Sequence, residues 1–195
     1  MPRDMMPRRW TLVLPLLALA GACSGGPVPY TTLPVDPALG FADPTRQAII
    51  HAAYVFPRPA SLQGRTAEAA QGISEAEHLT VELRHGARWI EMSPLASMAF
   101  EQARPEWRGA LGIPAEAAPQ AVIDALTRVR NAVAANDQAA AASALAPPVF
   151  VPGGTETLDR LTNLPPLPRT AWAASLTLQE MWRMQRQNSR SLLVR

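Results

Sequence analysis

Apolar residues recur every three or four positions along much of the chain, and this spacing constrains the fold more than any other feature. The clearest case begins at Pro119, where Val122, Leu126, Val129 and Val133 follow at intervals of four, three and four residues. The interval matches the 3.6 residues of a helical turn, so these side chains share one helix face. Because such faces must bury against one another, the sequence predicts a mainly α fold.

Capping residues, prolines and glycines indicate where the helices begin and end. Asp43-Pro44 and Ser93-Pro94 each combine a side chain suited to the N-cap with a proline in the first turn, where no N–H is needed. Gly112 stands where the helix that begins at Pro94 should end. We expect helices over residues 44–56, 63–85, 94–111, 119–135, 138–146, 155–161 and 169–189. The predicted architecture is a helical bundle of about four long helices plus short helices.

Single residues add three details to this bundle. Pro105 should kink or divide the third helix, because proline lacks the backbone donor. Residues 149–151, Val-Phe-Val, are the only plausible strand, and the flanking prolines argue against a central position in a sheet. Tryptophans carry a large apolar area and are expected in the core. Those of the helical part are Trp89, Trp107, Trp172 and Trp182.

The first residues of the chain have a different character from the rest. Arg8 and Arg9 precede an apolar run over residues 10–20, and small residues lead from there to Cys23, the only cysteine. A basic region, an apolar region and a small-residue region in this order are typical of an export signal. The apolar run is shorter than the ~20 residues of a membrane-spanning helix, and Pro15 interrupts it.

Residues 19–23, Leu-Ala-Gly-Ala-Cys, resemble the signal of bacterial lipoproteins. In that family, cleavage falls just before the cysteine, and the thiol carries a diacylglyceryl group. The resemblance implies a signal peptide over residues 1–22 and a lipid anchor on Cys23. Ser24, which stands where aspartate would favour the inner membrane, implies the outer membrane, facing the periplasm. Cleavage by ordinary signal peptidase, which would leave Cys23 free, is the alternative.

A proline-rich stretch separates the anchor from the helices. Pro27, Pro29, Pro34 and Pro37 favour extended backbone between the lipidated cysteine and Asp43. We therefore expect a tether over residues 23–42, followed by one helical domain over residues 43–195.

The composition excludes several classes of function. All 18 basic residues are arginines, so a Schiff-base lysine and a phosphate-loop lysine are both impossible. A lone cysteine excludes thiolate zinc clusters. Removing residues 1–22 takes away three arginines and Asp4, which leaves 15 arginines against 15 acidic residues. A nucleic-acid-binding protein would carry a basic surplus, so none is indicated.

One group of side chains has the spacing of a metal site. The group consists of Glu75, His78, Glu82 and His85. Intervals of three, four and three residues place these four in one sector of a helix, where they could bind zinc, copper or nickel with a further ligand such as His51. The sector points away from the apolar face of the same helix, so a solvated polar face is the favoured interpretation.

The C-terminal helix is basic at its far end. Arg183, Arg186 and Arg190 follow Glu180, the only acidic residue of this segment. Such a helix end could contact anionic lipid headgroups or an acidic partner protein. A solvated terminus in which the helix dipole favours the arginines is the favoured interpretation.

No catalytic group stands out in the sequence, so it favours binding over catalysis. We expect a lipid-anchored cell-envelope protein that acts as a binding, accessory or structural subunit, with an envelope protein as its possible partner. A periplasmic metal-binding protein is the first alternative, using Glu75 to His85. A hydrolase of envelope polymers is a weaker one, because paired acids such as Glu75 and Glu82 also occur on ordinary exposed helices.

Overall fold

The computed structural model describes residues 28–34 and 43–193, with side chains up to residue 190. Its α-helices in this part of the chain are α1 (Pro44–Val55), α2 (Thr66–His85), α3 (Pro94–Leu111), α4 (Pro119–Ala134), α5 (Gln138–Ala144), α6 (Gly154–Thr162) and α7 (Pro168–Leu193). The described residues form no strand. The predicted mainly α class and the helical bundle are confirmed.

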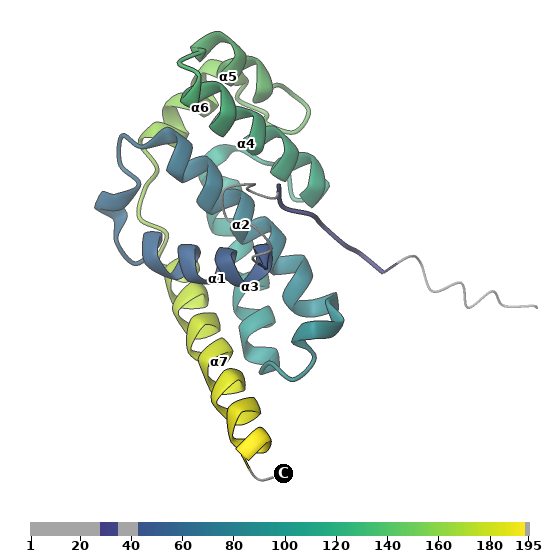
Figure 1. Ribbon diagram of the computed structural model, residues 1–195. Helices are drawn as coiled ribbons and strands as arrows, with labels where there is room; N and C mark the ends of the chain where they lie inside the picture. Colours follow the sequence, from purple (N-terminus) through teal and green to yellow (C-terminus); the bar gives the residue numbers. More distant parts are fainter. Residues whose placement is uncertain (1–27, 35–42, 194–195) are drawn as a thin grey trace, which may run out of the picture.

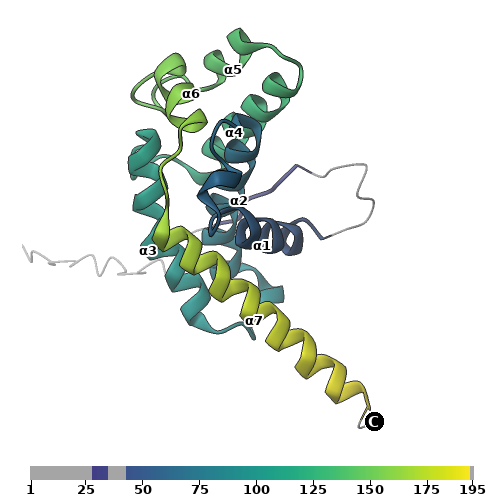
Figure 2. The ribbon, with the colours of Figure 1, turned by 90° about the vertical axis from the view of Figure 1, so that its left-hand side faces the viewer.

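Helix α2 lies at the centre of the bundle. It packs against α1, α3, α4 and α6, and most of its side chains between Ala69 and Leu83 are buried. Helices α5 and α6 form one end of the molecule beside α4. Helix α7 packs against α1 and α3, and it then extends past the opposite end of the bundle (Figures 1 and 2). None of the described helices has both the length and the hydropathy needed to cross a bilayer.

The predicted helix starts depend on local hydrogen bonds that the structure contains. Asp43 Oδ1 accepts from the Thr45 backbone N–H at 3.2 Å, and Asp137 Oδ1 accepts from the Ala140 N–H at 2.9 Å. Gly112 ends α3 in the left-handed conformation, with φ of 67°. A Cβ atom at Gly112 would also lie 2.5 Å from the Pro152 side chain, so both backbone and packing require glycine there.

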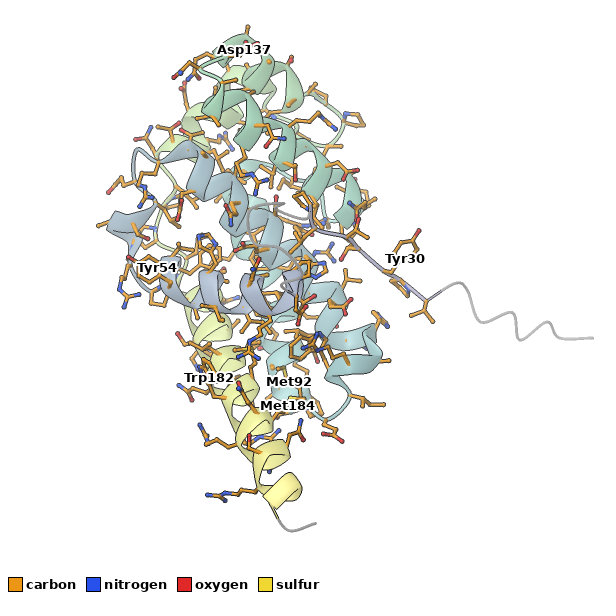
Figure 3. All side chains as sticks on the ribbon, in the orientation of Figure 1. Tyr30, Tyr54, Met92, Asp137, Trp182 and Met184 are labelled. Carbon is orange, nitrogen blue, oxygen red and sulfur yellow. The ribbon has the colours of Figure 1, made fainter. Side chains whose placement is uncertain are left out.

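The structure differs from three of the more detailed expectations. Helix α3 runs unbroken through Pro105, so this proline does not divide it. Residues 149–151 form a turn, in which Phe150 is fully buried. Trp172 and Trp182 are 58% and 39% exposed, so the prediction that both lie in the core is wrong. Figure 3 labels Trp182 on α7, and the guanidinium carbon of Arg46 on α1 lies 5.4 Å from the centroid of its ring.

Part of the predicted tether lies against the helical domain. Thr31 is buried, and its Oγ1 lies 2.9 Å from Nδ1 of His78 on α2. The Thr32 backbone exchanges two hydrogen bonds with the Gln120 side chain of α4, at 2.8 and 3.2 Å. Tyr30, just before them, points away from the domain (Figure 3). Residues 28–34 are thus held on α2 and α4, and the rest of the predicted tether lies outside the described residues.

A buried ion pair joins α2 to α3. Glu77 is fully buried, and its Oε1 accepts from Trp107 Nε1 at 2.8 Å and from Arg108 Nε at 2.7 Å. Its Oε2 accepts from Arg108 Nη2 at 2.8 Å and from Arg104 Nη2 at 3.1 Å. The Arg108 guanidinium therefore meets the carboxylate with two parallel hydrogen bonds, the strongest geometry for such a pair.

Arg108 also holds the turn between α3 and α4. Nη1 donates to the carbonyl oxygens of Pro114 and Ala115 at 2.8 and 2.9 Å, and Nη2 donates to that of Ala117 at 3.0 Å. All five N–H groups of the guanidinium then have acceptors. One side chain thus fixes α2, α3 and the turn that leads into Pro119, the first residue of α4.

Removing one member of this pair should be costly. Arg108→Met leaves the Glu77 carboxylate buried with only two of its four hydrogen bonds, so we expect the free energy of unfolding to fall by about 3–5 kcal/mol. Urea denaturation at pH 7 measures the change. Arg84→Met is the matched control, because the Arg84–Glu101 ion pair is largely exposed and should contribute less than about 1 kcal/mol. Equal losses for the two variants would contradict the expectation.

Candidate functional site

An open cleft of about 500 Å³ lies between α1, α2, α4 and the segment that includes residues 33–34. Its volume is within the range of small-molecule sites. Side chains from all four elements reach it, among them Leu33, Ile50, His51, Glu75 and Arg130. Figures 1 and 2 show the segment, in purple, beside α2 and the start of α4. We call this feature the α1–α2–α4 cleft.

His51 lies in the cleft with a carboxylate oxygen close to each of its ring nitrogens. Nδ1 lies 2.5 Å from Glu75 Oε2, and Nε2 lies 3.0 Å from Glu68 Oε1. The outer oxygens are also occupied: Glu75 Oε1 accepts from Gln71 at 2.9 Å, and Glu68 Oε2 accepts from Arg65 at 3.3 Å. The imidazole therefore bridges two carboxylates that α2 presents about two helical turns apart.

This arrangement favours the charged imidazolium. Burial by itself lowers the pKa of His51, but hydrogen bonds and attraction from Glu75 and Glu68 outweigh it and raise that pKa to about 9. Burial also raises the pKa of Glu75, and its bond to His51 opposes this. Both ring nitrogens face carboxylate oxygens, so an imidazolium that donates from both satisfies the geometry. The His51 charge in turn balances the partly buried carboxylates.

Another part of the cleft wall carries polar groups without partners. Ser74 is 4% exposed, and its Oγ has no hydrogen-bond partner among the described residues. Gln47, Thr127 and Arg130 line the same cleft. Within the described part of the chain, no hydrogen bond or ion pair involves their side chains. These groups remain available to a ligand.

His78 lies in the interior on the same helix, three residues from Glu75. Its ring is held between two threonine hydroxyls: Nδ1 lies 2.9 Å from Thr31 Oγ1, and Nε2 lies 2.9 Å from Thr45 Oγ1. Burial lowers its pKa to about 4, and the charge of Asp43 opposes the shift only in part. A neutral ring has one donor and one acceptor, so one threonine donates to it and the other accepts. His78 thereby joins α2 to α1 and to residues 28–34.

The four predicted metal ligands do not form one site in the described structure. Glu75 points into the cleft, His78 bonds to the threonines, Glu82 is half-buried, and His85 is exposed. No three His, Cys, Asp or Glu side chains of the described residues gather closely enough to hold an ion. The favoured interpretation of this sector, a solvated face, is wrong for Glu75 and His78, because α1 covers that side of α2.

The other predicted site residues have separate places. Arg183 pairs with Glu180 at 2.8 Å and donates to the Glu91 carbonyl at 3.1 Å, so its charge is engaged within the chain. Arg186 and Arg190 are exposed on the projecting half of α7. Cys23 lies outside the described residues.

Sequence analysis missed the bridge that His51 forms between Glu68 and Glu75. His51 was named only as a possible extra metal ligand, and it does contact Glu75, one of the four candidates. Glu68 and Glu75 follow His51 in the sequence by 17 and 24 residues, and they lie on α2 whereas His51 lies on α1. The only sequence signal was the seven-residue spacing of Glu68 and Glu75, which puts both on one side of a helix.

Comparison with protein-family models gave no match, and comparisons with curated proteins and with solved structures gave no significant match. The function is therefore argued from the site itself.

Acidification should weaken the fold through His78. Its pKa is lowered from 6.5 to about 4 in the folded chain, so between these pH values the unfolded chain binds more protons. At about 1.4 kcal/mol per pH unit, the stability lost from pH 6.5 to pH 4 is on the order of 3 kcal/mol. In urea denaturation, the free energy of unfolding of His78→Gln should therefore fall less than that of the wild type between pH 6.5 and pH 4, by that amount. His85→Gln, at an exposed position, should follow the wild type. Parallel curves for wild type and His78→Gln would rule out this role.

Protonation of His51 should persist well above neutral pH. We expect imidazole ¹H–¹⁵N spectra to show both ring nitrogens protonated at pH 7.5, with loss of one proton near pH 9. His51→Gln assigns the signal. The associated stability is fully present below pH 6.5 and is lost as the pH rises through about 9. A neutral ring at pH 7.5 would contradict the expectation.

Proposed function

We propose that this protein is a lipid-anchored component of the cell envelope that acts by binding a small molecule in the α1–α2–α4 cleft. The observation that supports binding is the cleft itself, an opening of about 500 Å³ bordered by three helices and residues 33–34. It combines apolar side chains with a few polar ones, which is the usual composition of a small-molecule site. The lipid anchor is argued from the signal and Cys23.

Binding explains the cleft better than catalysis does. A general base needs a free lone pair directed at its substrate, and both ring nitrogens of His51 are occupied by carboxylates. Glu75 and Glu68 are themselves bonded to His51. A glycoside hydrolase needs two carboxyl groups that face one substrate, whereas Glu82 is not among the side chains that line the cleft. The site is therefore better suited to binding a ligand than to catalysing a reaction.

Metal binding on α2 stays the alternative from another class. It would require His78 to leave both threonine hydroxyls and turn towards Glu82 or His85. In the described residues, the His51 bridge does not offer such a site either, because its two carboxylates lie at opposite nitrogens of the ring. A zinc-dependent rise in melting temperature that His78→Ala and His85→Ala together abolish would favour this alternative.

Native mass spectrometry of the full chain, purified gently from membranes, tests the proposed function. We expect an acylated Cys23 and a bound small molecule on the wild type. Thr127→Trp should remove the bound molecule, because Thr127 lines the cleft and an indole would fill it. Thr155→Trp, at an exposed position on α6, should retain it. An unmodified N-terminus would overturn the anchor. A molecule bound to all three proteins, or to none, would overturn binding in the cleft.

A further inference from the structure

We propose that the α1–α2–α4 cleft takes a small organic carboxylate with an apolar body, and that Arg130 anchors the carboxylate group. This inference rests on the proposed binding function and names the chemical class of the ligand. It is carried by an unpaired cation, unpaired hydroxyl and amide groups, and an apolar rim, all on one cleft.

Among the described residues that line the cleft, Arg130 is the charged side chain without a hydrogen-bond or ion-pair partner. It is half-buried on α4, and within the described residues it forms no ion pair. Other half-buried or buried arginines are engaged: Arg108 and Arg104 bind Glu77. A guanidinium presents paired N–H groups that match the two oxygens of a carboxylate. Arg130 is therefore suited to bind an anionic group at the cleft wall.

Neither Glu75, which lines the cleft, nor Glu68, which lies on the far side of the His51 ring, supplies that anion. Glu75 and Glu68 both contact His51, at 2.5 and 3.0 Å, and Arg65 adds a second cation on Glu68 at 3.3 Å. With His51 protonated, its charge and that of Arg65 balance the two carboxylates. The charge of Arg130 is then the surplus in the cleft, and a ligand of one negative charge would neutralise it.

Ser74 supplies an independent observation. A buried hydroxyl without a hydrogen bond is destabilising relative to a bonded one. Ser74 is buried, and its Oγ has no hydrogen-bond partner among the described residues. Its residue lines the cleft together with Gln47 and Thr127, whose side chains also lack partners within the described chain. A ligand oxygen in the cleft would satisfy donors that the protein leaves unbonded.

Apolar groups at the cleft indicate the rest of the ligand. Ile50 and Tyr54 are 42% and 55% exposed, and their spacing of four residues places them side by side on α1. Leu33 and Pro34 line the cleft from the extended segment. A bare inorganic anion would leave these surfaces in water, whereas an aliphatic or aromatic body would cover them. The two sets of contacts together favour an amphiphilic acid.

The test uses the full chain in nanodiscs, titrated calorimetrically with 4-phenylbutyrate and with the uncharged 4-phenylbutan-1-ol, with empty nanodiscs subtracted. We expect the acid to bind at least tenfold more tightly than the alcohol. Arg130→Gln should abolish this preference, and Arg130→Lys should retain part of it. Arg128→Gln is the matched control, because it removes a charge from an exposed position on the same helix and should keep the preference.

Ser74→Ala separates binding from folding. Since Ser74 Oγ has no partner within the described residues, its removal should leave the melting temperature unchanged or raise it. The same variant should weaken 4-phenylbutyrate binding several-fold. A purely structural role would give the opposite pattern, with a lower melting temperature and unchanged affinity.

Three results would overturn the inference. Equal affinity for the acid and the alcohol would mean that the cleft does not select a carboxylate. Acid binding that survives in Arg130→Gln would remove Arg130 as the anchor. Absence of binding by either compound would exclude this ligand class. The proposed function has its own test in each case. It holds if native mass spectrometry finds a bound molecule on the wild type that Thr127→Trp loses.

Discussion

The buried pair between Glu77 and Arg108 sets the positions of three helices. Arg108 donates to the Glu77 carboxylate on α2 and to three backbone carbonyls just before α4. In a protein interior, neither charge could remain without the other. Since α2 and α4 form two walls of the cleft, the distance between those walls depends on an ion pair that lies on the other side of α2.

Helix α2 carries polar side chains in several directions, and each direction serves a different contact. Glu77 faces α3, His78 faces α1 and residues 28–34, and Glu75 faces the cleft. A central helix usually presents apolar residues to its neighbours, so these positions trade hydrophobic burial for directional bonds. Ser74 differs from them, because it is buried without a partner in the described chain. That difference, at a residue that lines the cleft, is one of the observations on which the proposed ligand binding rests.

Two histidines on adjacent helices have opposite electrostatic environments. His51 lies between carboxylates, which raise its pKa to about 9 against the effect of burial. His78 lies between neutral hydroxyls, so burial dominates and lowers its pKa to about 4. Around neutral pH the first ring is charged and the second is neutral. The His51 bridge therefore keeps its own charges balanced, while the joint to residues 28–34 stays uncharged.

The positions of the helices could be predicted from residue order alone, because helix starts and ends depend on neighbours along the chain. Asp43-Pro44, Ser93-Pro94 and Gly112 act within one turn, and the structure confirms all three. Only the tertiary structure decided which helix covers which face. Periodicity assigned the side of α2 with Glu75 and His78 to solvent, yet α1 packs there. Ion pairs, the His51 bridge and the cleft join residues on different helices, and residue spacing within one helix carries no information about its neighbours.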